Sequence, residues 1–203
     1  KCGRLSEELK IKNLYIKDET RNPTGSFKDR PITVAVSKAV ELGTDTVTIA
    51  SSGNAGASTA AYAAKAGLSS VIFVPEKTQP GKLSQIATCG ANLIAVKGSY
   101  SDAHEISRIA SKKYGWCNTT TTFLNPYCTE GDKTLAYELY EQLANKVPDW
   151  ILIPIGAGPL LVGCYKGFGE LERMSLTNGL PHMVGVQAAG CSPIAKAFMD
   201  GRP

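Results

Sequence analysis

Lys28 is the side chain of this sequence best suited to covalent chemistry with a carbonyl compound. It follows the segment Asn-Pro-Thr-Gly-Ser-Phe at 22–27 and precedes an apolar run that starts at Pro31. Pro23 presets φ and Gly25 can take a positive φ, so the segment predicts a tight turn that presents Lys28 at the entrance of a helix. A lysine amine in that position can form a Schiff base. Taken alone, however, a lysine among acidic neighbours is more often a solvated surface residue.

Two further loops have the composition of anion-binding sites. Ser51-Ser52-Gly53-Asn54-Ala55-Gly56 and Gly156-Ala157-Gly158 each lie between an apolar, strand-like run and an expected helix. The first N–H groups of a helix have no partner within the helix, and the positive end of its dipole attracts anions. The serines and Asn54 would equally suit an ordinary helix N-cap, so the loops alone leave both functions open.

Strand-like and helix-like segments alternate along the chain. Strands are expected at 14–16, 47–50, 71–74, 93–96, 151–153 and 183–187, and helices at 31–42, 57–66, 82–89, 102–115, 130–144 and 160–172. Asp102 and Glu105 predict the capping box that begins the helix at 102. This alternation, with strands apolar on both faces, predicts an α/β fold with parallel sheets covered by helices. Ligands are then expected at the carboxyl ends of the strands.

Composition restricts the classes of partner. The chain has 203 residues, 43% of them hydrophobic, and a formal net charge of +4 from scattered Lys and Arg, with only 7% aromatic residues. A nucleic-acid binder would show a basic stripe, often with stacking aromatics, so no nucleic acid is expected. The longest uncharged run, 150–165, is shorter than the roughly 20 residues that a membrane helix needs, so no membrane contact is expected.

The six cysteines lie far apart, none of them in a Cys-x-x-Cys pair, and the chain has only two histidines. This spacing disfavours a zinc site, and a chain with so large an apolar fraction needs no disulfides. We therefore expect reduced thiols, a cytoplasmic location and no metal. The sequence starts at Lys1 without Met and stops at Pro203 soon after an expected strand, so we also expect a segment of a longer protein.

The three loops, in this order, resemble the fold-type II pyridoxal-phosphate (PLP) enzymes of the tryptophan synthase β-like superfamily. Within them the chain is most similar to the threonine synthases, over almost its whole length. The resemblance implies a two-domain α/β architecture that is incomplete here, in which 45–121 is a small mobile domain and 1–44 and 122–203 are parts of the large PLP-binding domain. It also implies a PLP cofactor, a small-molecule amino-acid substrate and, as the common default, a homodimer.

The resemblance also assigns roles to residues. Lys28 is the catalytic residue and holds the cofactor as a Schiff base. The implied cofactor-binding residues are Phe27, Lys28, Asn54, Gly156, Ala157, Gly158 and Leu160, and the implied substrate-binding residues are Ser51, Ser52, Gly53, Asn54 and Ala55. Pro159 departs from the family pattern, because it stands where an N–H donor for the cofactor phosphate is expected. The phosphate cup would then use fewer donors or be shifted.

The implied reaction converts O-phosphohomoserine and water into threonine and phosphate. Asn125-Pro126-Tyr127 and the following Glu130–Thr134 resemble a threonine synthase segment, but Cys128 replaces the family arginine and Thr122-Phe123 replaces an Asn-Ser pair. That arginine helps to bind the substrate phosphate in several family members. The departures keep open β-elimination or β-replacement on serine, threonine or O-phosphoserine, as in threonine dehydratase or cysteine or cysteate synthase.

Nucleotide sites are weaker alternatives. A dinucleotide fingerprint would need glycine where Leu161 stands, and no acidic residue follows the strand that ends at Gln187. The Pro80-Gly81-Lys82 segment lacks the earlier glycine of a P-loop and is followed by Leu83. A non-catalytic nucleotide-binding module remains the alternative from another class. It would not bind PLP, and the change Lys28→Ala would leave its ligand affinity unaffected.

Overall fold

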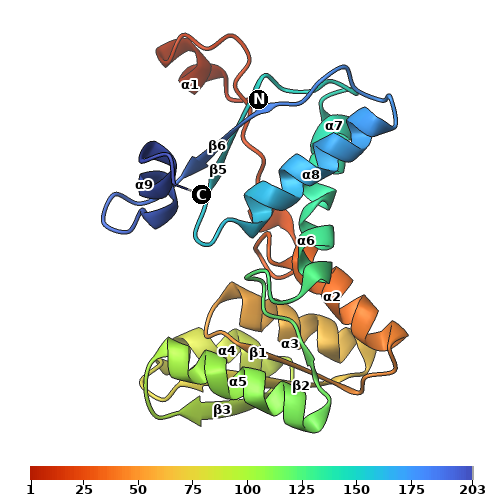
Figure 1. Ribbon diagram of the computed structural model, residues 1–203, viewed down its shortest axis with the longest axis vertical. Coiled ribbons are helices and arrows are strands. Elements are labelled where there is room, and N and C mark those ends of the chain that lie inside the picture. Colours follow the sequence, from red (N-terminus) through yellow and green to blue (C-terminus); the bar gives the residue numbers. More distant parts are fainter. Residues whose placement is uncertain (203) are drawn as a thin grey trace.

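A four-stranded parallel sheet forms the lower part of the molecule (Figure 1). The computed structural model describes residues 1–202, except for the side chain of Lys82. The strand order is β3-β2-β1-β4, with β1 at Thr46–Ala50, β2 at Ser69–Pro75, β3 at Asn92–Val96 and β4 at Cys117–Asn118. All neighbouring strands pair in parallel, for example Ile49 with Ile72. The predicted α/β class with parallel sheets is confirmed.

Helices cover both faces of this sheet, because successive residues of a strand point to opposite sides. Ile49 and Ile72 pack with α3 (Asn54–Ala66) and α4 (Pro80–Thr88), whereas Ala50 and Phe73 pack with α5 (Tyr100–Tyr114). The predicted alanine-rich helix is α3, and Gly67 ends it in the left-handed conformation (φ +72°), as expected.

A second, two-stranded sheet lies above the first and is formed by β5 (Trp150–Pro154) and β6 (His182–Val186). Helices α7 (Thr134–Gln142) and α8 (Pro159–Arg173) supply its core with Leu135, Phe168 and Leu171, against which Ile153 packs. The alternate residues Trp150 and Leu152 are 60% and 65% exposed. The expectation that every strand is covered on both faces is therefore wrong for β5 within the described residues.

Helices α2 (Asp29–Glu41) and α6 (Pro126–Asp132) lie between the two sheets and pack against each other. The predicted helix at 130–144 begins earlier, at Pro126, because Asn125 accepts a hydrogen bond from the Tyr127 N–H and so caps the helix. It is interrupted at Lys133, whose carbonyl accepts from Ala136, three residues on. The result is two helices, α6 and α7, in place of one.

Two other predicted local features are wrong. The strand expected at 14–16 is irregular; Tyr15 and Ile16 are 50% and 66% exposed, and no strand among the described residues pairs with this segment. Helix α5 begins at Tyr100 and not at 102, because Ser99 and Asp102 form the capping box. Ahead of α2, the regular elements of the described chain are α1 (Gly3–Glu8) and the short helix η1 (Glu19–Arg21).

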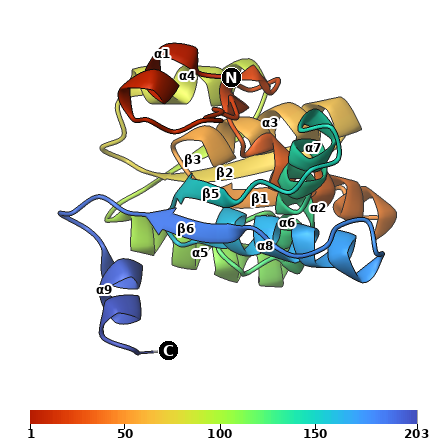
Figure 2. The same ribbon diagram turned by 90° about the horizontal axis from the view of Figure 1, so that it is seen from above.

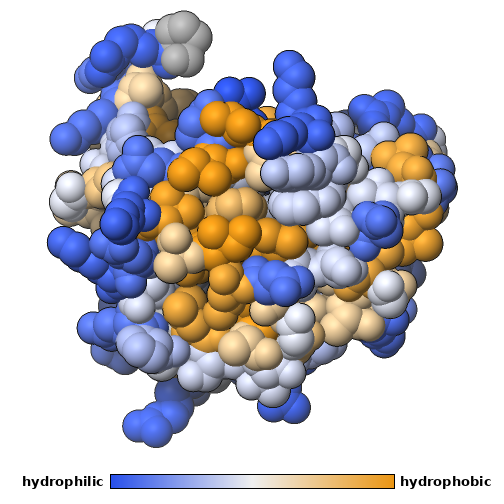
Figure 3. Space-filling view, turned by 90° about the horizontal axis from the view of Figure 1, so that it is seen from below, coloured by the Kyte–Doolittle hydropathy of each residue, from blue (hydrophilic) through white to orange (hydrophobic). Residues whose placement is uncertain are grey.

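Exposed apolar side chains occur on several elements of the molecule, among them α9 and α5. Seen from above, α9 (Pro193–Met199) stands apart from the rest (Figure 2), and its Phe198 and Met199 are 84% and 85% exposed. Figure 3 views the end where β3 and α5 lie, and apolar side chains gather over the middle of this face. Ile94 of β3 and Ile106 and Ile109 of α5 are among the exposed apolar residues. Within residues 1–202 no helix is both long and apolar enough to cross a membrane.

Candidate active site

Lys28 stands at the N-cap position of α2 and faces a cavity of about 370 Å³. The cavity lies at the carboxyl end of β1, where Ala50 and Ser51 line it, and beside the segment 120–122 that follows β4. The Lys28 amine donates a hydrogen bond of 2.8 Å to the Thr121 hydroxyl and lies 4.6 Å from the centre of the Phe27 ring. The strand-end position predicted for the ligand site is thus where the lysine is found.

Buried Asp29 holds the turn that presents this lysine. Its carboxylate accepts hydrogen bonds from the Thr24 N–H (2.8 Å), the Thr24 hydroxyl (2.5 Å) and the Ser58 hydroxyl of α3 (2.7 Å). Gly25 takes φ +79° inside the turn, a conformation that side chains rarely adopt. Lys28 is therefore fixed to rigid structure on both sides, since α2 follows it directly.

Arg30 fastens the same helix end to the upper half of the molecule. Its guanidinium donates to both oxygens of Glu19 (2.6 and 2.7 Å), to Glu138 of α7 (2.6 Å) and to the Thr134 hydroxyl (3.1 Å). Burial opposes the charge, but the hydrogen bonds that Arg30 donates to the two glutamates raise its pKa. The bidentate pairing fixes the orientation of the α2 N-terminus as well as its position.

The surroundings of Lys28 favour the neutral form of its amine more strongly than bulk water would. Burial lowers the pKa of the Lys28 amine, and nearby Asp132 and Cys128 oppose this change. Burial raises the pKa of the Cys128 thiol to about 12, so this residue stays uncharged. Burial also raises the pKa of Asp132 to about 7, although Lys28 and Arg30 favour its ionised form.

The loop before α3 leaves the helix N-terminus without a side-chain cap. Gly53 is the N-cap residue and no side chain bonds to the first turn, so the alternative of an ordinary N-cap by Ser51, Ser52 or Asn54 is not what the structure has. The Ser51 hydroxyl instead accepts from the Gly53 N–H at 3.3 Å. A helix end with uncapped N–H donors beside an amine is suited to a carboxylate.

Gly56, in the first turn of α3, had no predicted role. A Cβ at position 56 would lie 2.4 Å from the Ser51 carbonyl oxygen, so the loop can turn onto α3 only if this residue is glycine. Six residues that line the Lys28 cavity were also without a predicted site role: Ile49, Ala50, Tyr100, Thr120, Thr121 and Thr122. The threonine-rich composition of 119–122 was the available signal, but its place beside Lys28 depends on tertiary structure.

The structure brings together part of the predicted set. Lys28, Ser51, Asn54 and Ala55 line one cavity, and Phe27 contacts Lys28. Ser52 and Gly53 line, together with Asn54, a neighbouring cavity of about 370 Å³ that reaches Gly81 and Gln85 of α4.

The loop Gly156-Ala157-Gly158 lies at the carboxyl end of β5 and leads into α8. Gly156 and Ala157 are exposed, and Gly158 takes φ +92° as the N-cap of α8. Pro159 occupies the first helical position, where its missing N–H removes one donor without disturbing the helix. The Gln187 side chain donates to the Gly156 carbonyl at 3.0 Å and so holds the loop. Neither this loop nor Leu160 lines the Lys28 cavity in the described structure.

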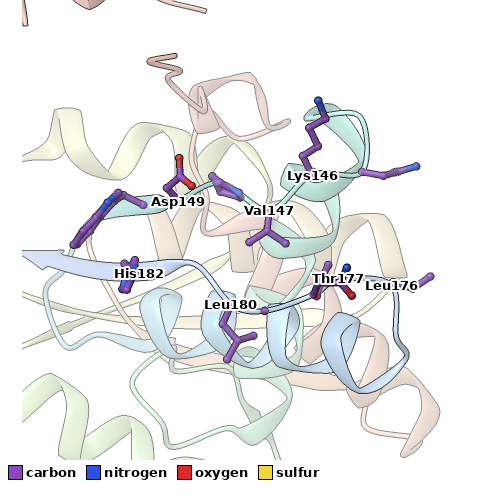
Figure 4. Close-up of a pocket in the computed structure, with 12 residues that line it drawn as sticks. Lys146, Val147, Asp149, Leu176, Thr177, Leu180 and His182 are labelled. Carbon is purple, nitrogen blue, oxygen red and sulfur yellow. The ribbon is translucent and has the colours of Figure 1, made fainter. Parts of the chain in front are cut away.

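A larger cavity, about 780 Å³, lies at the opposite ends of β5 and β6. Figure 4 shows it between the loop that leads into β5 and the loop that leads into β6, with Val147, Thr177 and Leu180 among its walls. The Thr177 hydroxyl is buried without a hydrogen-bond partner among the described residues. This cavity shares no lining residue with the Lys28 cavity and contains none of the predicted site residues.

Comparison with known proteins agrees with this geometry. A family model described as pyridoxal-phosphate dependent enzyme matches residues 1–203. The chain is similar to the threonine synthases of Methanosarcina acetivorans (44% identity, 100% of this chain and 50% of the relative) and Methanocaldococcus jannaschii (43%, 98% and 49%). It therefore spans about half the length of these curated relatives.

Solved structures show the same fold. The processed form of threonine deaminase isoform 2 from Solanum lycopersicum superposes with a TM-score of 0.85 at 24% identity, over 98% of this chain and 53% of that one. An L-serine ammonia-lyase from Rhizomucor miehei gives a TM-score of 0.85 at 25% identity, over 99% and 62%. The fold-type II architecture expected from the three loops is confirmed by these likenesses.

Proposed function

The chain belongs to the pyridoxal-phosphate dependent enzyme family, and we propose that the whole protein is an amino-acid lyase of the threonine synthase type. The proposed reaction converts O-phosphohomoserine and water into threonine and phosphate: the Cγ–O bond to phosphate and one Cβ–H bond break, Cγ takes up a proton, and the hydroxyl of water adds at Cβ. The observation that carries the proposal is the partly buried Lys28 amine, which shares one cavity with the uncapped N-terminus of α3.

The residues present fit the cofactor. Lys28 offers a partly buried amine with a lowered pKa for the cofactor aldehyde, Phe27 lies against that amine, and Asn54 reaches the same cavity. Gly156, Ala157, Gly158 and Leu160 at the start of α8 are the proposed holders of the cofactor phosphate, since a helix N-terminus with a glycine approach attracts phosphate. When bound, PLP withdraws electrons and makes the Cα proton of an amino acid acidic.

Lys28 is the proposed acid-base residue. A lysine works as a base only as a neutral amine, and the burial that lowers its pKa increases the neutral fraction near neutral pH. The hydrogen bond to Thr121 holds the amine toward the cavity. Lys28 would take the substrate proton at Cα and return it at a later step, so one residue serves both directions.

The substrate carboxylate is proposed to bind at the start of α3. Ser51, Asn54 and Ala55 line the Lys28 cavity, and Ser52 and Gly53 continue the loop into the neighbouring cavity. Backbone N–H groups at this helix end are free of side-chain caps, and the helix dipole favours a negative group there. Fixing the carboxylate at this point orients the Cα–H bond relative to Lys28.

A second candidate function is β-elimination or β-replacement on serine, threonine or O-phosphoserine. It is favoured by Cys128, which stands where the similar threonine synthase segment has arginine and is 1% exposed and uncharged. Lys28 is the one cationic side chain among the residues that line its cavity in the described structure. A substrate phosphate would then depend on N–H donors and hydroxyls such as those of Thr120 and Thr121, or on another part of the whole protein.

Four further properties belong to the proposal. We propose that residues 45–121, which contain the four-stranded sheet, move as a small domain relative to 1–44 and 122–203. We also propose that the substrate is phosphorylated. A homodimer is proposed as the common arrangement of symmetric enzymes. A cytoplasmic location is proposed because all six cysteines are free thiols in the described chain.

A substrate panel tests the activity. The full-length protein loaded with PLP is given O-phosphohomoserine, O-phosphoserine, serine and threonine in separate assays, and threonine, phosphate, ammonia and 2-oxo acid are measured. Threonine and phosphate from O-phosphohomoserine are expected. Lys28→Ala should abolish turnover, whereas Lys38→Ala on the outer part of α2 should retain it. No threonine, with ammonia or 2-oxo acid from another substrate, would replace the first candidate by the second.

A further inference from the structure

Asp132, the last residue of α6, is a buried acid that the proposed reaction does not use. It is 1% exposed, and its Oδ1 atom has no hydrogen-bond partner within the described residues. Burying a carboxylate oxygen without a hydrogen bond is unfavourable, and such groups are rare in folded proteins. The position of Asp132 therefore needs a physical explanation.

Two close backbone contacts hold Asp132 against the lysine-bearing end of α2. A Cβ at Gly131 would lie 2.2 Å from the Arg30 carbonyl oxygen and 2.7 Å from the Pro31 Cα, so α6 rests directly on the first turn of α2. From the other side, a Cβ at Gly163 of α8 would lie 2.4 Å from the Asp132 Cβ. Asp132 is thus enclosed between α8 and the turn that begins at Lys28.

The titratable groups that face Asp132 come from all three packed helices. They are Lys28 and Arg30 of α2, Cys128 of α6 and Cys164 of α8. Burial raises the pKa of each of the two thiols to about 12, so both are uncharged near neutral pH. The Arg30 guanidinium already binds two carboxylates, Glu19 and Glu138.

Lys28, unlike Arg30, is not bound directly to a carboxylate of the described residues. Its amine is bonded to the neutral Thr121 hydroxyl, and no carboxylate lies within 4.0 Å of it among the described residues. Asp132 is the acidic group whose charge acts on this amine. The close approach of α6 to the first turn of α2 at Gly131 also places Asp132 next to the helix end that begins at Lys28.

We propose that Asp132 is the buried counter-ion that sets the protonation state of Lys28 and so controls when this amine can react with the cofactor aldehyde. An ionised Asp132 favours the ammonium form of Lys28, which is not a nucleophile, and a protonated Asp132 favours the neutral amine. The step moves a single proton and changes no bond to carbon. Because the pKa of Asp132 is raised to about 7, the change falls near neutral pH.

Asp132 is accordingly a positioning residue that acts through Lys28. The inference rests on the proposed role of Lys28, but its test needs neither cofactor nor substrate, so the two can fail separately. The full-length protein freed of PLP is acetylated with trace acetic anhydride from about pH 4 to about pH 11, a range that spans most of the ordinary carboxyl and lysine pKa values in proteins. Mass spectrometry then gives the labelling of Lys28 relative to exposed Lys65 of α3.

Wild type, Asp132→Asn and the exposed control Asp45→Asn are compared. The Asn variant keeps the shape of the side chain and removes its charge, so the labelling midpoint of Lys28 should fall by about one pH unit, which is roughly tenfold higher reactivity at a given pH below it. The wild-type curve should show two coupled steps, and Asp45→Asn should match it. An unchanged midpoint in folded Asp132→Asn would overturn the proposal.

If Asp132→Asn does not fold, the pH dependence of Lys28 labelling in the wild type tests the proposal alone. Two coupled steps in the labelling of Lys28, with a single step for Lys65 under the same conditions, support the coupling to a second titrating group. A single step at Lys28 contradicts it. A merely structural role of Asp132 would change stability and leave the shape of this curve unaltered.

Discussion

The Lys28 amine donates a 2.8 Å hydrogen bond to the Thr121 hydroxyl, although the two residues are 93 positions apart in the chain. Thr121 is 5% exposed and belongs to the polar segment that follows β4, whereas Lys28 begins α2. The bond therefore joins the proposed small domain to the lysine turn. It also directs the amine into the cavity that Ser51 and Asn54 line.

Thr121→Val should weaken PLP binding by the full-length protein. Valine keeps the shape of threonine and removes the acceptor of the Lys28 amine, so the lysine loses its preferred orientation. A loss of about 1 kcal/mol, roughly fivefold in the dissociation constant, is expected. Fluorescence titration with PLP measures it, with Thr44→Val in the loop before β1 as the control. Equal affinities for both variants would show that the bond does not position Lys28.

Asp29→Ala should destabilise the protein and loosen the lysine turn. The change removes the acceptor of three hydrogen bonds, two from Thr24 and one from Ser58. At about 1 kcal/mol each, the free energy of unfolding should fall by about 3 kcal/mol. Urea unfolding followed by circular dichroism measures the change. Asp45→Ala, at an exposed position, should remain within about 0.5 kcal/mol of wild type, and a similarly small effect at Asp29 would contradict the account.

Two glycines of α8 should respond to alanine in opposite directions. A Cβ at Gly163 would lie 2.4 Å from the Asp132 Cβ and 3.0 Å from its carbonyl carbon, so Gly163→Ala should cost about 3 kcal/mol through overpacking. At Gly169 nothing lies within 4 Å, so Gly169→Ala should stabilise the same helix by about 1 kcal/mol. Unfolding midpoints of the two variants measure the difference. Equal shifts would mean that α8 does not approach α6 as closely as described.

The Arg30 ion pairs should give stability that acid removes. Burial opposes the charge of Glu138, but hydrogen bonds from Lys17 and Arg30 lower its pKa below the usual 4.5. A lowered carboxyl pKa adds stability above the unfolded value, and this part is lost as pH falls through the lower, folded value. The urea concentration at the unfolding midpoint should therefore decrease when the pH is lowered below 4.5. This decrease should be smaller in Arg30→Met than in wild type.

Near neutral pH, Arg30→Met itself should cost about 2 kcal/mol, a figure reduced for the 36% exposure of the Glu138 side chain. Arg108→Met on α5 is the matched control, because its pair with Glu105 is about half exposed on both sides and should contribute less than about 1 kcal/mol. Urea unfolding at several pH values checks both statements. An Arg30 variant as stable as the Arg108 variant would contradict them.

Local sequence signals were sufficient for β1, β2 and β3 of the four-stranded sheet, whereas the two-residue strand β4 was not predicted. The apolar run at 47–50 and the alanine-rich segment closed by Gly67 correspond to β1 and α3. The start of α6 was missed because proline usually ends a helix. Pro126 instead occupies the first helical position, directly after the N-cap residue Asn125, where proline is favourable. The segment 14–16 has the apolar composition of a strand, but within residues 1–202 it pairs with no strand.

The candidate site was predicted where its residues are adjacent in the chain. Lys28 and the loop from Ser51 to Ala55 carry motif chemistry that the sequence displays directly. Thr121 and Asp132 reach Lys28 only through packing of distant segments, which no local pattern encodes. The close approach at Gly131 is likewise a property of α2 and α6 together.

The visible absorbance of the purified full-length protein with PLP, before and after borohydride, tests the central claim that Lys28 holds the cofactor. A reducible chromophore is predicted, with the reduced adduct mapped by peptide analysis to Lys28 and absent from folded Lys28→Ala. Lys38→Ala, in the same helix, should keep the chromophore. No chromophore in folded wild-type protein, or an adduct on another lysine, would contradict the claim.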